Sequence, residues 1–231
     1  MRNAKDTSLD VAENLANVRR LISAAEAARN NSDAPVELIA VSKMHSVETI
    51  KMALASGHRV FGENRVQETQ KKWPDQRDRY PDLSLHLIGP LQTNKSADAV
   101  ELFDVIQTVD RPKLARALAS HIQKSSRNPE CMIQVNIGDE AQKAGVSIAD
   151  FPDLLAQCRG EFDLPISGVM CIPPVSENPA PYFALLAKLA DRHDLKTLSM
   201  GMTGDYETAI KFGATSVRVG TGIFGPRPTI V

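Results

Sequence analysis

The sequence lacks the features that mark several common classes of protein. It has only three cysteines, Cys131, Cys158 and Cys171, which lie far apart and form no CxxC or Cys/His cluster. Neither a disulfide framework nor a zinc site is indicated, and we expect three reduced thiols, with Cys171 the least inert. Because GxxxxGK[ST], GxSxG and HExxH motifs are absent and the five histidines show no metal spacing, we expect no metal.

An excess of charge of one sign and long apolar runs are also missing. The chain has 27 basic and 28 acidic residues, for a net charge of −1, which gives no electrostatic case for nucleic acid or an anionic membrane. Its apolar runs are too short to span a bilayer, and the N-terminal MRNAKDTSLDVAENLANVRR has no apolar leader core. We therefore expect a cytoplasmic protein. The balanced charge leaves the oligomeric state open, and we expect a monomer or weak homodimer.

What the chain does have is a repeated rhythm of apolar runs and amphipathic stretches. Residues 8–29 carry an amphipathic pattern that predicts a helix. The β-rich apolar runs that follow predict strands at 36–42, 58–62, 85–89, 103–109, 131–137, 166–172, 197–201 and 216–220. Between them, helical patterns cover 47–56, 66–72, 94–102, 111–124, 148–159, 181–192 and 205–212.

Strands that alternate with helices predict a parallel sheet. Eight strands in 231 residues predict an α/β fold, a single (β/α)8 TIM-type barrel with an extra N-terminal helix. We expect one domain over residues 1–231, with a doubly wound open sheet as the alternative fold. In a barrel, functional residues lie where the strands end.

Lys43 follows the first predicted strand directly. One interpretation is a lysine whose stem covers apolar surface while its charge reaches solvent. The other is a desolvated amine that attacks a carbonyl group and forms a Schiff base. Both interpretations are open from this residue alone.

Glycines and hydroxyls follow the last two predicted strands. Thr203 lies between Gly201 and Gly204, and Gly220 and Thr221 follow the eighth strand. These loops frequently form a phosphate site in barrels, although the glycines could also serve tight turns only. A Schiff-base lysine beside a phosphate site indicates either a phosphorylated sugar, as in an aldolase, or pyridoxal 5′-phosphate (PLP).

Arg218 and Asn64 bear on this choice. Arg218 lies two residues before Gly220, so the two can face the same side. A cation beside a pyridine nitrogen keeps it unprotonated, which favours PLP; the alternative for Arg218 is a buried ion pair with a barrel acid. Glu63 and Asn64 are expected in the mouth after the second strand, where Asn64 either bonds a ring hydroxyl or caps the next helix.

Six stretches carry a resemblance to a known family: AVSK (40–43), FGENRVQE (61–68), HLIGPLQTNKS (86–96), QVNIGDEAQKAGV (134–146), LSMGMTGDYETAI (198–210) and VRVGTGIFGPR (217–227). At these residues the sequence resembles the pyridoxal phosphate homeostasis proteins, whose single-domain barrel is like that of alanine racemase. The resemblance implies that Lys43 forms the internal aldimine and that Asn64 contacts the ring. It also implies that Arg218 sits at the pyridine nitrogen, and that the phosphate is held by Ser199, Thr203 and the backbone around Gly220 and Thr221.

The sequence departs from the family pattern at three places. Thr203 stands where the family usually has serine, and Gly204 where it has an acidic or polar residue. Met44-His45-Ser46 replace the usual Thr-Lys-Pro after the lysine. None of these changes removes Lys43.

The resemblance implies a protein of intracellular PLP homeostasis that supplies the cofactor to client enzymes, and not an enzyme. The alternative is a PLP-dependent amino-acid racemase or a Schiff-base aldolase. Alanine racemases take a second acid/base, a tyrosine, from an added β-domain. We expect no such domain after the last predicted strand, and of the three tyrosines only Tyr206 is expected near the mouth.

Overall fold

The computed structural model describes residues 10–29 and 35–226 of the chain. Its strands form one closed barrel in chain order, and every neighbouring pair is parallel. The strands are β1 (Glu37–Val41), β2 (Val60–Glu63), β3 (Ser84–Leu87), β4 (Val105–Val109), β5 (Glu130–Val135), β6 (Ile166–Cys171), β7 (Thr197–Met202) and β8 (Ser216–Val219). The predicted barrel is confirmed, and the open sheet is wrong because β1 and β8 are hydrogen-bonded neighbours.

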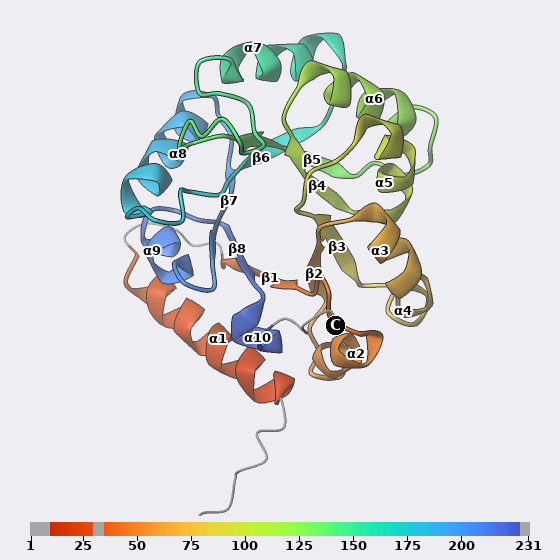
Figure 1. Ribbon diagram of the computed structural model, residues 1–231, viewed down its shortest axis with the longest axis vertical. Helices are drawn as coiled ribbons and strands as arrows, with labels where there is room; N and C mark the ends of the chain where they lie inside the picture. Colours follow the sequence, from red (N-terminus) through yellow and green to blue (C-terminus); the bar gives the residue numbers. More distant parts are fainter. Residues whose placement is uncertain (1–9, 30–34, 227–231) are drawn as a thin grey trace, which may run out of the picture.

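Helices surround the strands, as Figure 1 shows. They are α1 (Val11–Ala27), α2 (Val47–Ala55), α3 (Val66–Lys72), α4 (Pro74–Arg79), α5 (Ser96–Leu102), α6 (Pro112–Ile122), α7 (Phe151–Ala156), α8 (Ala180–Arg192), α9 (Tyr206–Lys211) and α10 (Thr221–Phe224), with a 3₁₀ turn η1 (Thr93–Lys95) and a π-helical turn η2 (Gln157–Glu161). The sequence did not predict α4 and α10, because α4 buries only Gln76 and α10 is a single turn.

The extra N-terminal helix α1 closes one side of the molecule. Its buried residues form the predicted apolar face, which packs against α9 and α10 (Figure 1). Asp10 caps it by accepting a hydrogen bond from the N–H of Glu13 at 2.9 Å. The predicted start at Ser8 and the break at residues 30–33 lie outside the described residues.

The two faces of the strands differ in polarity. On β8, Val217 and Val219 pack into the hydrophobic core, and Arg218 lies on the opposite face, inside the barrel. Barrel interiors are usually filled by branched apolar side chains, but this one also contains His86, Gln107 and Ser199, all at most 3% exposed. The interior is therefore able to hold a fixed polar network.

The three cysteines are buried and free. Burial raises the pKa of Cys158 and of Cys171 to about 12, so these thiols stay protonated at neutral pH. Over residues 10–29 and 35–226, no helix has the length and apolar character needed to cross a bilayer. Over the same residues, no group of three or more His, Cys, Asp or Glu side chains is placed to hold a metal ion.

Candidate functional site

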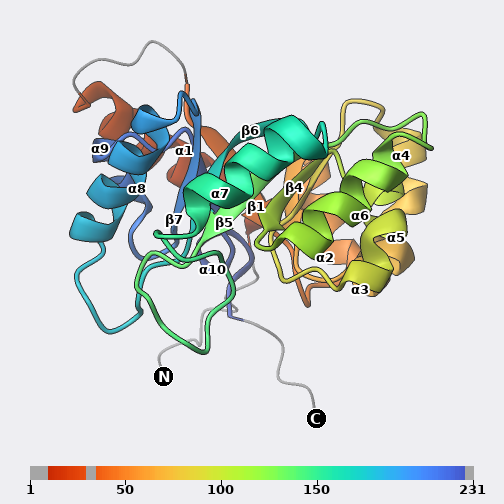
Figure 2. The same ribbon diagram turned by 90° about the horizontal axis from the view of Figure 1, so that it is seen from above.

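A cavity of about 260 Å³ lies at the C-terminal ends of the strands. Figure 2 shows α10 and the long loop 136–150 at this same end of the barrel. The cavity is lined by Val41, Lys43, Asn64, Ile88, Ile172, Met202, Thr203, Gly204, Arg218, Gly220 and Thr221. The structure thus brings together every predicted site residue except Ser199. The apolar lining residues were not predicted, although their places at strand ends could have indicated them.

Lys43 contributes its side chain to the cavity from the end of β1. The preceding residue, Ser42, extends the sheet by donating its N–H to the carbonyl of Gly62 at 3.1 Å. Lys43 is half-buried and lines the cavity. This position favours the interpretation of an amine that meets a ligand over that of a solvated surface charge.

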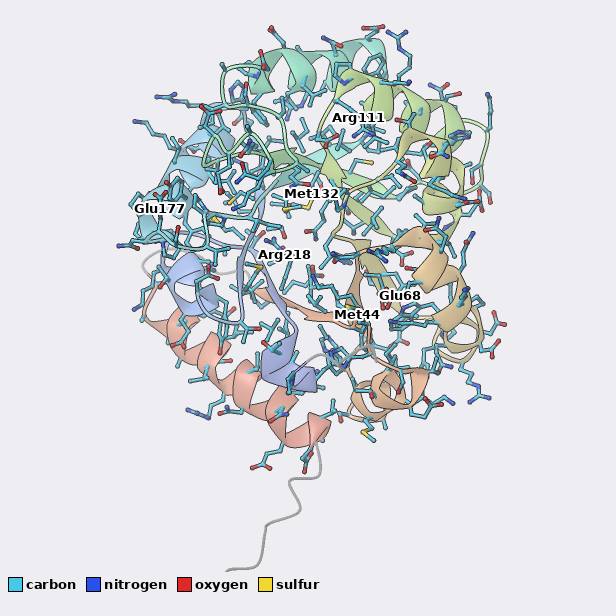
Figure 3. The ribbon with its side chains drawn as sticks, viewed as in Figure 1. Met44, Glu68, Arg111, Met132, Glu177 and Arg218 are labelled. Atoms are coloured by element: carbon cyan, nitrogen blue, oxygen red, sulfur yellow. The ribbon has the colours of Figure 1, made fainter. Side chains whose placement is uncertain are left out.

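Arg218 lies at the floor of the cavity, near the centre of the barrel in Figure 3. Its Nη1 donates to Ser199 Oγ at 2.6 Å, and its Nη2 donates to the carbonyl of Cys171 at 2.8 Å. Burial lowers the pKa of Arg218, while Cys171 and Asp205 oppose that change. In the part of the chain that the structure describes, no carboxylate lies within ion-pair distance of Arg218. The alternative of a buried ion pair is therefore not supported.

A chain of buried hydrogen bonds continues below Arg218. Ser199 Oγ donates to Gln107 Oε1 at 2.7 Å, and Gln107 Nε2 lies 2.9 Å from His86 Nδ1. Because Gln107 offers an amide N–H, Nδ1 accepts and the imidazole proton sits on Nε2, 3.1 Å from Ser84 Oγ. Burial lowers the pKa of His86 to about 4, which keeps the ring neutral.

This network bears on the role expected of Ser199. The resemblance implied that Ser199 contacts a phosphate, but its hydroxyl is fully buried and engaged by Arg218 and Gln107. The position of Ser199 on the inner face of β7, below Arg218, explains the difference. The burial and hydrogen bonding of His86 agree with its place on a buried strand. Sequence reasoning missed Gln107, which a search for polar residues at inward strand positions could have found.

Thr203 and Gly220 come together from the ends of β7 and β8. The N–H of Gly220 donates to Thr203 Oγ1 at 3.3 Å. A Cβ on Gly222 would lie 3.0 Å from Val219 Cγ1 and 3.2 Å from Thr203 Cγ2, so glycine there leaves room for the threonine. The N–H groups of Thr221 and Gly222 belong to the first turn of α10, where helix carbonyls cannot accept from them. Hydroxyl and backbone donors on these loops can bind an anion.

Asn64 lines the cavity from the loop after β2. Its Oδ1 is buried and has no hydrogen-bond partner. The N-cap of α3 is Arg65, without a side-chain cap bond, so the helix-cap interpretation of Asn64 is not supported. A Cβ on Gly89 would lie 2.4 Å from the Asn64 carbonyl oxygen, which shows how closely the chain after β3 packs there. The amide thus has spare hydrogen-bonding capacity for a ligand.

Glu63 and Tyr206 lie away from the cavity, contrary to expectation. Strand alternation directs Gly62 inward and Glu63 outward, where Glu63 Oε1 accepts from Ser42 Oγ at 2.8 Å and from Trp73 Nε1 at 3.1 Å. Tyr206 is buried on α9, close to Gly201. The other two tyrosines are also engaged elsewhere: Tyr182 bonds Glu177, and Tyr80 stacks under Arg59.

Comparison with protein families and curated proteins gives consistent matches. The family model for the N-terminal domain of alanine racemase matches residues 12–228. The pyridoxal phosphate homeostasis protein of Pasteurella multocida is 36% identical over 229 residues, covering 95% of this chain and 98% of the relative. The protein of the same name from Escherichia coli K12 is 38% identical over 227 residues, covering 94% and 97%.

Solved structures match as well. PipY of Synechococcus elongatus with PLP bound has a TM-score of 0.79 and 37% identity, covering 93% of this chain and all of that one. An alanine racemase of Clostridium difficile has a TM-score of 0.69 at 13% identity, with 57% of its length covered. The second likeness concerns the fold alone.

Proposed function

Because this chain belongs to the pyridoxal phosphate homeostasis protein family, we propose that it binds PLP in the cavity and holds it on Lys43. The Lys43 amine adds to the aldehyde carbon, a C=N bond replaces the C=O bond, and one water molecule leaves. We also propose that residues 1–231 act as a single binding domain. The observation that carries the proposal is that an amine, a buried guanidinium and an anion-binding loop pair line one cavity.

The residues present fit this group. Thr203, Gly220 and Thr221 offer donors for the phosphate, and the unpartnered Oδ1 of Asn64 marks an amide that can meet a ring substituent. Arg218 can only donate hydrogen bonds, so it suits an unprotonated pyridine nitrogen. PLP supplies a reversible aldehyde and a ring that is a strong electron sink only when its nitrogen is protonated. Arg218 therefore keeps the bound ring a weak electron sink.

This site fits storage and supply of the cofactor better than it fits catalysis. Among the described residues that line the cavity, only Lys43 and Arg218 are titratable. A racemase needs a second acid/base facing the cofactor, and the three tyrosines are all engaged elsewhere. We propose that the clients are PLP enzymes, to which the cofactor passes when the reversible C=N bond is hydrolysed.

Borohydride reduction followed by peptide mass mapping tests the binding proposal. We expect a pyridoxyl label on Lys43 of protein reloaded with PLP, and loss of both label and yellow colour in Lys43→Ala. Lys95→Ala is the matched control, since Lys95 lies on η1 and pairs with Asp98, and it should keep the label on Lys43. Wild-type protein that takes up no label on Lys43 would contradict the proposal.

A second measurement separates a carrier from an enzyme. Protein loaded with PLP is incubated with L-alanine, and the optical rotation of the alanine is followed over time. A stable rotation supports the carrier role, whereas rapid loss of rotation would show a racemase.

A further inference from the structure

The residue after Lys43 has a backbone conformation that L-amino acids rarely adopt. Met44 has a φ of 65°. A hydrogen bond of 3.1 Å from the His45 N–H to the Ser42 carbonyl closes a four-residue turn with Lys43 and Met44 at its centre. When the third residue of such a turn has a positive φ, that residue is usually glycine or asparagine. Met44 is 42% exposed, so the packing of its side chain does little to hold this conformation.

Two side chains of α3 hold the turn on either side of Lys43. Glu68 Oε1 accepts from the Met44 N–H at 2.6 Å, and Lys72 Nζ donates to the Ser42 carbonyl at 2.8 Å. Figure 3 shows Met44 beside Glu68. The two α3 side chains also pair with each other at 2.9 Å, one helical turn apart. The backbone before and after Lys43 is thus tied to one face of α3.

The same lysine connects this pair to the protein core. Lys72 Nζ lies 2.7 Å from Glu63 Oε1, and the Glu63 side chain is fully buried. That oxygen also accepts from Ser42 Oγ and Trp73 Nε1. Because the Lys72 side chain is only 10% exposed, the pair has little freedom to move away from the turn.

We propose that Glu68 and Lys72, the clamp, are positioning residues that hold the turn 42–45 so that the Lys43 amine is directed into the cavity. Neither residue lines the cavity, so the clamp acts through the backbone and not by touching a ligand. Only the reaction of the Lys43 amine rests on the proposed function; the strained turn and its bonds do not.

The carboxyl group of Glu68 is ionised at neutral pH. Burial alone would raise the pKa of Glu68. Hydrogen bonds from Lys72 and the Met44 N–H, together with the charges of Lys72 and Arg65, outweigh this effect, so the net pKa is lowered. Glu63 lies against the ammonium group of Lys72. Burial raises the pKa of Glu63, and Lys72, Ser42 and Trp73 oppose that rise. The Glu68 carboxylate therefore remains an ionised acceptor for the turn.

The test compares Glu68→Ala, Met44→Gly and the double variant during loading with PLP, followed by the visible absorbance of the C=N bond. Glu68→Ala should slow loading by about tenfold, because the strained turn loses its main support. Met44→Gly in the Glu68→Ala background should restore most of the rate, because glycine adopts positive φ without strain. General loosening of α3 would not be repaired by a glycine in the turn.

Two further variants calibrate the result. Glu68→Gln keeps an oxygen acceptor for the Met44 N–H, so it should slow loading less than Glu68→Ala. Asp98→Ala removes the carboxylate of the Lys95–Asp98 pair, which is 3.5 Å long and includes no residue of the turn or the clamp. This variant should load like wild type. Wild-type loading by Glu68→Ala, or no recovery in the double variant, would overturn the clamp.

An arm without PLP keeps this outcome separate from the proposed function. Amide hydrogen exchange of the apo-protein should be about tenfold faster at Met44 in Glu68→Ala than in wild type, and unchanged in Asp98→Ala. Unchanged exchange in Glu68→Ala would overturn the clamp even if Lys43 carries PLP. Absence of label on wild-type Lys43 would overturn the proposed function, while faster exchange would still support the clamp.

Discussion

Arg218 and Ser199 are joined inside the barrel by a hydrogen bond of 2.6 Å, with the guanidinium as donor and the hydroxyl as acceptor. The same hydroxyl donates to Gln107 at 2.7 Å. A second donor of Arg218 reaches the Cys171 carbonyl. The position of the cation is thus fixed by β6 and β7 before any ligand binds, which is the preorganisation that a binding site requires.

Ser199→Ala should destabilise the protein and weaken its hold on PLP. The substitution leaves a buried donor of Arg218 and the Gln107 oxygen without their partner, which costs about 1–3 kcal/mol of unfolding free energy. Ser216→Ala is the matched control: Ser216 is paired in register with Ser199 and is also buried, but its Oγ has no partner. Urea unfolding of both apo-variants measures the difference. Equal losses for the two serines would refute the role given to the network.

Thr203 should act through its hydroxyl and not through its methyl group. Thr203→Ser keeps the oxygen that accepts from the Gly220 N–H, so PLP affinity should stay close to that of wild type. Thr203→Val keeps the shape but loses the hydroxyl, and the dissociation constant should rise about tenfold. Titration of PLP into the apo-variants measures both constants. Similar affinities for the serine and valine variants would show that the hydroxyl does not contact the ligand.

Stability should fall as the pH drops from 6.5 towards 4, because two histidines are held neutral. Burial, with smaller effects from Arg19 and Arg59, lowers the pKa of His58 to about 4, and burial lowers that of His86 to about 4. Between these values and the ordinary 6.5, both histidines bind more protons in the unfolded chain than in the folded one. Their contribution to stability therefore rises with pH in this window and is constant above it. Each histidine contributes roughly 3 kcal/mol to that change.

His58→Gln isolates one of these contributions. His58 Nδ1 lies 3.1 Å from Arg19 Nη2, and Nε2 lies 2.7 Å from the Val60 carbonyl, so protonation would place an N–H against the arginine. A glutamine can serve both partners without titrating. The loss of unfolding free energy between pH 7 and pH 4 should be smaller in the variant by roughly 3 kcal/mol, as measured by urea unfolding at each pH. A parallel pH dependence in both proteins would contradict this.

Local sequence patterns predicted the elements well but not the environment of every polar side chain. The eight strands and all the helices between them except α4 follow from apolar periodicity, which reflects burial on one or both faces. Glu63 and Asn64 are neighbours, yet alternation turns Glu63 under α3 and leaves Asn64 at the cavity. A shift of one residue in the predicted strand reverses such an assignment, which is why Glu63 was placed wrongly.

The sequence by itself determined the barrel and the gathering of six site residues at the ends of strands. Both follow from short-range periodicity and from the common direction of parallel strands. The six residues are Lys43, Asn64, Thr203, Arg218, Gly220 and Thr221. The tertiary structure alone decided the partners of the buried polar groups. Ser199 and Gln107 are 92 residues apart and meet across the barrel, and Glu68 reaches the turn residue Met44 from α3. Such pairs depend on how the barrel closes, which no local pattern records.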